Sequence, residues 1–154
     1  MTSPLGGAAD LEHLSEFAGV LVADVSTRRG GFDLLHEISD DPTPSVVADL
    51  LLQRSQRSDS LLLISKDGDT IVGLGVAAQG SRVTHIGLFV RPSHRNQGRG
   101  TTMLDQLIVW ANDHGSGPLE GWSLPGDRSM KQRFEITGFK ARLLIMQRPA
   151  DYSH

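Results

Sequence analysis

The sequence Leu-Phe-Val-Arg-Pro-Ser-His-Arg-Asn-Gln-Gly-Arg-Gly-Thr at residues 88–101 decides the fold. It opens with β-prone residues, is stopped by Pro92, and crosses a polar turn to glycines at positions 98 and 100. Apolar residues then recur at helical spacing, at Met103, Leu104, Leu107, Ile108 and Ala111. This order predicts a strand, a glycine-rich turn and a helix.

The glycine-rich turn lies where the predicted helix begins. The first turn of a helix leaves backbone N–H groups without intrahelical partners, and glycine lets a ligand approach them closely. Residues 97–101 are therefore a candidate anion cradle, with phosphate as the expected guest. A Walker-type loop would need a Lys before its Ser or Thr, and a dinucleotide fingerprint would need a small residue where Met103 stands. Both of these phosphate-binding motifs are excluded.

Residues 95–100, Arg-Asn-Gln-Gly-Arg-Gly, resemble the Q/R-x-x-G-x-G/A signature of the GNAT superfamily of N-acetyltransferases, whose loop holds the pyrophosphate of acetyl-CoA. Taken alone, the six residues also fit a structural turn. Residues 127–139 resemble the family's C-terminal pattern N-x-x-A-x-x-L-Y-E-x-x-G-F. Glu135, Gly138 and Phe139 match it, whereas the departures are Asp127 for Asn, Met130 for Ala, Arg133 for Leu and Phe134 for Tyr. The resemblance covers residues 61–147 well and the first sixty loosely.

The resemblance implies an α/β fold with a mixed, mostly antiparallel sheet, a splayed central pair of parallel strands, and helices on both faces. At 154 residues the chain suits one domain. We place this acetyl-CoA-binding domain at residues 10–148, after a loose lead-in at residues 1–9 and before a tail at residues 149–154. The strand with which the family usually opens is expected to be short or absent.

The remaining elements follow from periodicity and turn signals. Asp10 is expected to cap a helix with an apolar stripe from Leu11 to Val25, and Thr43-Pro44 to start a second one. Residues 32–41 lack a clean period and are predicted to form a connection. A short helix is expected at residues 128–136, and strands are expected at residues 61–65, 70–78, 83–90, 119–124 and 140–147. Gly87 inside its strand predicts either a bulge or a close backbone approach, and a bulge would suit the family.

Composition excludes several functions. The chain has no cysteine, so it has no disulfides, no zinc finger and no cysteine nucleophile, and a cytoplasmic location is expected. A net charge of -3 argues against a nucleic-acid binder. The apolar run at residues 18–23 is too short to span a membrane. The six histidines lack metal-ligand spacing, so no metal is expected. The oligomeric state stays open, with a homodimer as one option.

The resemblance implies direct transfer of an acetyl group from acetyl-CoA to an amine, with a small molecule as the expected acceptor. The Leu88 N–H is the expected donor to the acetyl carbonyl. We expect Arg95 to be structural and Arg99 to be exposed. The predicted cosubstrate-binding residues are Leu88, Phe89, Val90, Arg95, Asn96, Gln97, Gly98, Arg99, Gly100, Thr101, Asp127 and Phe134.

The general base is less well marked. Thr84 aligns with the family's usual base and can order a water, while His85 reaches the site only if a bulge at Gly87 changes the strand's parity. Phe134 lacks the hydroxyl that many members use to protonate the thiolate, which leaves Ser123, Ser129 or a water for that role. These departures also allow a second function, a regulatory or interaction domain that binds acyl-CoA without transfer.

Overall fold

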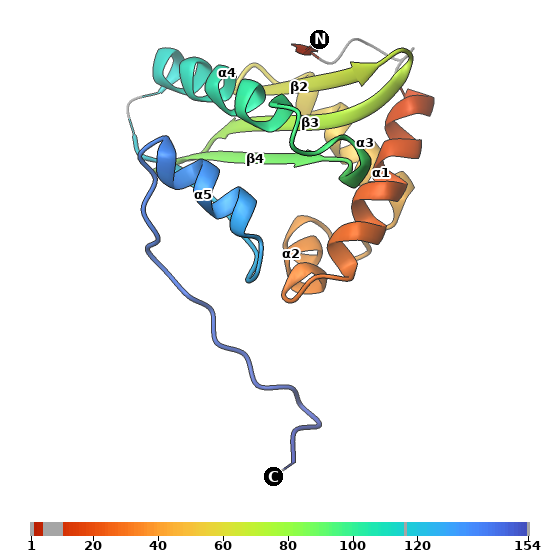
Figure 1. Cartoon of the computed structure of the whole chain (residues 1–154), viewed down its shortest axis with the longest axis vertical. Helices are drawn as coiled ribbons and strands as arrows, with labels where there is room; N and C mark the ends of the chain where they lie inside the picture. The colour runs from red at the N-terminus through yellow and green to blue at the C-terminus, as the bar shows by residue number, and fades with distance from the viewer. Residues whose placement is uncertain (1, 5–10, 116, 154) are drawn as a thin grey trace.

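The structure, a computed structural model, describes residues 2–4, 11–115 and 117–153 of the chain. Five strands form one sheet in the order β1-β2-β3-β4-β5. Figure 1 labels its central strands β2, β3 and β4. The strands are β1 (Thr2–Pro4), β2 (Ser60–Asp67), β3 (Thr70–Gln79), β4 (Thr84–Val90) and β5 (Leu119–Gly121). The helices are α1 (Leu11–Ser26), α2 (Gly31–Ile38), α3 (Pro44–Ser55), the 3-10 turn η2 (Pro92–His94), α4 (Arg99–His114) and α5 (Arg128–Ile136).

All neighbouring strands are antiparallel except β4 and β5, which run parallel. The predicted mixed sheet with one parallel pair is therefore confirmed. A parallel pair needs a crossover connection, which α4 supplies. Within the predicted lead-in, Thr2–Pro4 pairs with Leu63, Ile64 and Ser65 of β2. The lead-in thus holds a short strand, and the rest of it lies outside the described residues.

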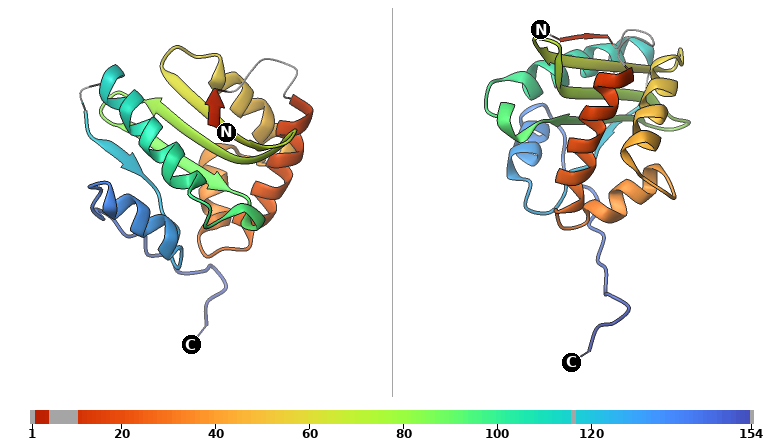
Figure 2. Two further views of the ribbon diagram at one scale, coloured as in Figure 1. Left: turned by 45° about the horizontal axis from the view of Figure 1, so that its top comes forward. Right: turned by 90° about the vertical axis from the view of Figure 1, so that its right-hand side faces the viewer.

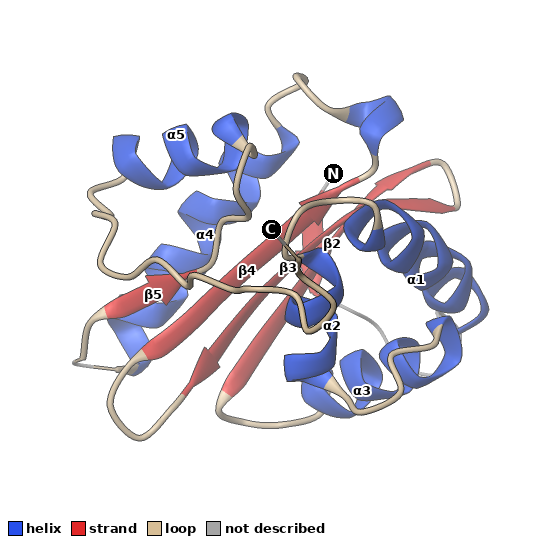
Figure 3. Ribbon diagram, turned by 90° about the horizontal axis from the view of Figure 1, so that it is seen from below, coloured by secondary structure: helices blue, strands red, loops and turns tan. Residues whose placement is uncertain are grey.

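Helices cover both faces of the sheet, as Figures 2 and 3 show, because each strand alternates its apolar side chains between two cores. The first core joins α1 and α3 to one face and contains Leu14, Phe17, Ala18, Val47, Ala48, Leu62, Ile64, Ile71 and Leu74. The second joins α4 and α5 to the other face and contains Leu63, Ala77, Ile86, Val90, Met103, Leu104, Leu107, Ala111 and Phe134. The apolar stripe that predicted α4 is the buried side of that helix.

Two local signals are confirmed in detail. Thr43 caps α3, since its side-chain oxygen accepts a hydrogen bond from the Val46 N–H at 3.4 Å, with Pro44 at the first helical position. Gly68 turns the β2–β3 hairpin at a φ of 61°, a left-handed conformation that favours glycine.

The predicted connection at residues 32–41 is wrong in its first part, because Gly31–Ile38 forms α2. Gly30 begins this helix in a left-handed conformation, with φ at 76°. Leu35 is its one large buried side chain, and Phe32 and Ile38 are exposed. A helix of two turns with so little buried surface leaves almost no period to read in the sequence.

Of the two alternatives predicted for Gly87, the bulge is wrong. The β3–β4 register is continuous from Gly73↔Val90 to Gln79↔Thr84, and Gly87 pairs with Val76. A Cβ at position 87 would lie 3.3 Å from a methyl group of Val76, so this glycine makes room for a side chain on the neighbouring strand. The irregularity of the sheet lies at Ser65/Lys66 in β2 instead.

The C-terminal part of the chain differs most from the prediction. β5 ends at Gly121, three residues before the predicted end, and residues 140–147 form no strand. Alternating apolar residues favour a strand only if a partner strand pairs with them, and this segment leads away from the body of the molecule (Figure 1). Its apolar side chains are 81–88% exposed, namely Leu143, Leu144, Ile145 and Met146. No helix in the described residues is long and apolar enough to cross a membrane.

Candidate functional site

The site begins where the pairing of β5 with β4 ends. The two strands pair through Thr84↔Leu119, His85↔Glu120 and Ile86↔Gly121, and then β5 stops. Residues 88–90 of β4 therefore continue without a partner on that side among the described residues. This splayed arrangement agrees with the prediction, and we call residues 88–90 the unpaired backbone of β4.

The hydrogen-bond pattern fixes where this backbone points. In an antiparallel pair, alternate residues exchange hydrogen bonds with the partner strand and the others direct their N–H and C=O groups away. The backbone N–H of Arg91 donates to the Val72 carbonyl on the β3 side, whereas the backbone N–H of Thr84 donates to the Pro118 carbonyl on the β5 side. In the continuous register, Leu88 and Val90 therefore present backbone groups on the β5 side. The Leu88 N–H has no acceptor there among the described residues.

The predicted anion cradle lies at the far end of this backbone. Asn96 and Gly98 have φ values of 64° and 80°, and Gly98 caps α4 without a side-chain hydrogen bond. The Gly98 carbonyl accepts from the Thr102 N–H at 3.0 Å. In the part of the chain that the structure describes, the N–H groups of Arg99, Gly100 and Thr101 have no acceptor. The first turn of α4 thus offers three donors next to the end of β4.

Arg95 and Arg99 both use their guanidinium groups within the protein. Arg95 donates to the Val90 carbonyl at 2.8 Å and lies over the Phe89 ring, 5.3 Å from its centroid, which is the structural position predicted for it. Arg99 is half-buried rather than exposed as predicted. Its Nη1 donates to Ser65 Oγ at 2.8 Å, so this side chain ties the start of α4 to β2.

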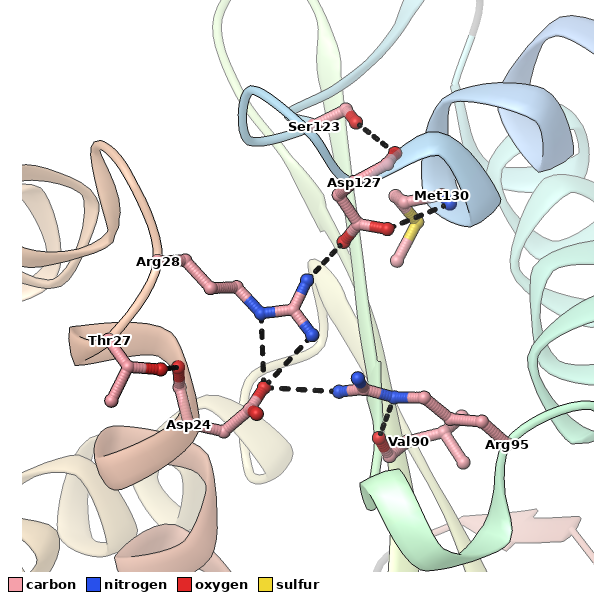
Figure 4. Close-up of polar contacts among 8 residues, drawn as sticks. All are labelled: Asp24, Thr27, Arg28, Val90, Arg95, Ser123, Asp127 and Met130. Atoms are coloured by element: carbon pink, nitrogen blue, oxygen red, sulfur yellow. Dashed lines mark hydrogen bonds and ion pairs between the residues drawn. The ribbon is translucent and has the colours of Figure 1, made fainter.

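An ion-pair network links three segments beside the cradle (Figure 4). Asp24 of α1 accepts from Arg28 at 3.2 Å and from Arg95 at 3.1 Å, and Arg28 also reaches Asp127 at 3.0 Å. The other carboxylate oxygen of Asp127 accepts from the Met130 N–H at 3.1 Å and so caps α5. Asp127, predicted to contact the cosubstrate, therefore has both oxygens engaged. The network holds α1, α5 and the approach to the cradle together.

We expect Asp24→Asn to lower the free energy of unfolding by about 1–2 kcal/mol, because Arg28 and Arg95 would both lose a half-buried charged acceptor. Urea denaturation measures this loss. Asp49→Asn is the matched control, since Asp49 is exposed on α3 and has no ion pair within the described residues. Equal midpoints for the two variants would show that the network adds nothing to stability.

Phe134 forms a wall of the site. Its ring is buried, and a Cβ on Gly121 would lie 2.3 Å from the ring's Cζ, so the ring packs directly on the last residue of β5. The predicted proton donors, Ser123 and Ser129, have other surroundings. Ser123 is exposed and donates to the Asp127 carbonyl, and Ser129 is exposed on α5. The structure thus places a phenyl group against the end of β5 and leaves both of these hydroxyls exposed.

The two base candidates lie near the start of β4, six residues and five residues before Val90. Thr84 is buried, with its hydroxyl near Gly115 at the end of α4. His85 is exposed on the opposite face of the strand, because the register has no bulge to change its parity. The structure therefore does not bring either side chain to the unpaired backbone of β4.

Sequence reasoning missed one residue near the cradle. Arg133 of α5 lies over Gly100, where a Cβ would be 2.7 Å from the guanidinium carbon. The signal was present as a departure from the family pattern, an arginine where leucine is usual. Arg133 and Gly100 are 33 positions apart in the sequence, and the fold brings Arg133 to the first turn of α4.

Two further features border the site. His94 donates to or accepts from Ser93 and contacts Asp67 at 3.0 Å, which joins the β2–β3 hairpin to the turn before the cradle and lowers the pKa of the Asp67 carboxyl. A shallow hollow lined by Glu135, Gly138, Phe139, Lys140 and Ala141 lies beyond α5 and includes no predicted site residue. No group of three acidic or histidine side chains in the described residues is placed to hold a metal ion.

Comparisons with known proteins agree with this geometry. Residues 32–123 match the model of the acetyltransferase (GNAT) family. No curated protein matches the chain.

Solved structures are similar in fold at low sequence identity. A mutant of the BH1408 protein from Bacillus halodurans has 15% identity and a TM-score of 0.71, over 97% of this chain and 98% of that one. A predicted acetyltransferase from Clostridium acetobutylicum, solved with acetyl-CoA, has 12% identity and a TM-score of 0.68 over 100% of both chains. The aminoglycoside N-acetyltransferase AAC(6')-Iy in complex with CoA has 15% identity and a TM-score of 0.60, over 97% of this chain and 100% of that one.

Proposed function

We propose that this chain, which belongs to the acetyltransferase (GNAT) family, binds acetyl-CoA and transfers its acetyl group to the amine of a small molecule. The observation that carries the proposal is the continuity of two sets of backbone donors. The unpaired backbone of β4 leads to the first turn of α4, where three further N–H groups lack acceptors among the described residues. Similar folds with CoA or acetyl-CoA bound support this assignment.

Bound acetyl-CoA supplies an acetyl thioester that is already activated toward amines. The N–H groups of residues 99–101 would hold its pyrophosphate, because an anion is stabilised at a helix N-terminus. The Leu88 N–H would donate to the carbonyl oxygen, where negative charge develops during attack. The Phe134 ring would pack beside the thioester. Holding the amine in line with the carbonyl supplies much of the remaining acceleration.

The proton balance is proposed to run through water. The new C–N bond forms as the C–S bond breaks, the amine loses one proton, and the leaving thiolate gains one. Thr84 stays the predicted candidate for ordering the water that takes the amine's proton, whereas His85, the other candidate, lies on the opposite face of β4 because the strand has no bulge. Phe134 carries no proton to donate, so water is our proposed donor to the thiolate. A thiol has a reference pKa of about 8.5, so its thiolate leaves readily at mildly alkaline pH.

A regulatory domain that binds acyl-CoA is the second candidate. Phe134 favours it, because the position next to the end of β5 holds a buried phenyl group and no titratable side chain. Such a domain would bind acetyl-CoA through the same cradle and release no product.

Release of free CoA in the presence of amines separates the two functions. We expect the protein to release CoA with at least one member of a panel of aminoglycosides, polyamines, amino acids and peptides. A thiol reagent detects the product with no signal from protein thiols, because the chain contains no cysteine. Gly98→Val serves as the control and should lose the signal. Binding of acetyl-CoA with no release for any amine would support the regulatory domain, and failure to bind it would reject both functions.

The absence of cysteine also fits our proposed cytoplasmic location.

A further inference from the structure

Arg133 of α5 stands out among the cations around the cradle. Arg95 and Arg99 both donate to protein acceptors. Arg133 is half-buried, yet its guanidinium has no hydrogen bond or ion pair with any residue that the structure describes. A guanidinium has five N–H donors, so a half-buried one normally finds an acceptor.

The place where Arg133 lies makes this more unusual. A Cβ at position 100 would be 2.7 Å from Cζ, 2.8 Å from Nη1 and 3.2 Å from Nε, so the guanidinium lies directly against Gly100. Gly100 is in the first turn of α4, the end of the helix that carries about half a positive charge. A cation next to that end is repelled by it. An anion bound between them would be attracted by both.

The packing of α5 holds Arg133 in this position. Phe134, the next residue, is buried against Gly121 and contacts the Phe139 ring at a centroid distance of 4.8 Å. At the other end of the helix, Asp127 is fixed by Arg28 and by the Met130 N–H. The absence of a side chain at position 100 is what lets the guanidinium approach the helix backbone.

We propose that Arg133 is a ligand of the CoA pyrophosphate, which it would share with the N–H groups of the first turn of α4. The inference rests on the proposed function and adds a residue that the family pattern does not supply, since leucine is usual there. Guanidinium groups form short, charge-assisted hydrogen bonds with phosphate oxygens. Arg133 would therefore select thioesters that carry a pyrophosphate over those that lack one.

Calorimetry with CoA and 3′-dephospho-CoA tests this proposal, because both ligands carry the pyrophosphate. We expect Arg133→Leu to weaken the binding of both by about tenfold, the size of one lost charge-assisted hydrogen bond. Arg133→Lys should lose less, since it keeps the charge. Arg128→Leu is the matched control, because it removes an exposed arginine from the same helix and should change affinity less than twofold. If Arg133→Leu does not fold, Arg133→Gln replaces it.

Four results would overturn the proposal. The first is a change in affinity below twofold in Arg133→Leu, and the second is an equal loss of affinity in Arg128→Leu. The third is a loss confined to CoA, which would indicate a contact with the 3′-phosphate. The fourth is an Arg133→Lys variant that binds as weakly as Arg133→Leu. Failure of the proposed function looks different. If the wild type binds no CoA, the proposed function and the role of Arg133 are both rejected. If Gly98→Val abolishes binding while Arg133→Leu leaves it unchanged, only the assignment of Arg133 falls.

Discussion

Gly98→Val and Gly100→Val should each lower the affinity for acetyl-CoA by about a hundredfold or more, as expected when two or more charge-assisted hydrogen bonds to phosphate are lost. The two variants act by different mechanisms. Gly98 has open space around it but a φ of 80°, which a β-branched side chain rarely adopts. Gly100 is an ordinary helical residue, and a valine there would displace the Arg133 guanidinium and also fill the space proposed for the pyrophosphate.

Calorimetry on folded protein measures both effects. Gly68→Val is the matched control for strain, because Gly68 also has a positive φ, at 61°, with nothing within 4 Å of a Cβ, and it lies in the β2–β3 hairpin. It should reduce stability and leave affinity nearly unchanged. An unaltered dissociation constant in a folded Gly98→Val protein would remove the cradle from the proposed function.

The second large effect is expected at the end of β5. In Gly121→Val the new Cβ would lie 2.3 Å from Cζ and 2.6 Å from Cε1 of Phe134, so the ring must move and α5 with it. We expect the free energy of unfolding to fall by about 1–3 kcal/mol, the usual cost of overpacking a core. Because α5 carries Arg133, acetyl-CoA binding should weaken as well.

Urea denaturation measures the stability change. Gly19→Ala is the control, because a Cβ there has nothing within 4 Å and alanine favours a helix over glycine by about 1 kcal/mol, so this variant should be stabilised. Combining Phe134→Ala with Gly121→Val should cost less than the sum of the two single changes, because the smaller side chain makes room. Strict additivity of the two changes would mean that the ring and Gly121 are not in contact.

The parts of the fold predicted correctly are those that local sequence determines. The glycine-rich turn and α4 follow from two glycines before an apolar stripe, and α3 from a Thr-Pro start. The predicted parallel pair follows from the length of the connection between two strands. In each case the residues that specify the element are neighbours in the chain, so their pattern can be read without knowing what lies opposite them.

The parts that were missed depend on residues far apart in the chain. Arg28 and Asp127 are separated by 99 positions, and neither shows in the sequence that it pairs with the other. The same holds for Gly87, whose role is to admit the side chain of Val76 on the next strand. A glycine signals that space is needed but does not say whether a turn, a bulge or a neighbouring side chain needs it.

The exposed run of Leu143, Leu144, Ile145 and Met146 has a consequence for colloidal stability. Short β-prone segments without charge promote association between chains, and flanking charged residues oppose it. Arg142 and Arg148 are the charges nearest to the two ends of this run. Because salt screens exposed charges over about 10 Å at 0.1 M, their protection weakens as ionic strength rises. This protein should therefore stay dispersed in dilute buffer and scatter more light as salt is added, the reverse of a protein that salt keeps in solution.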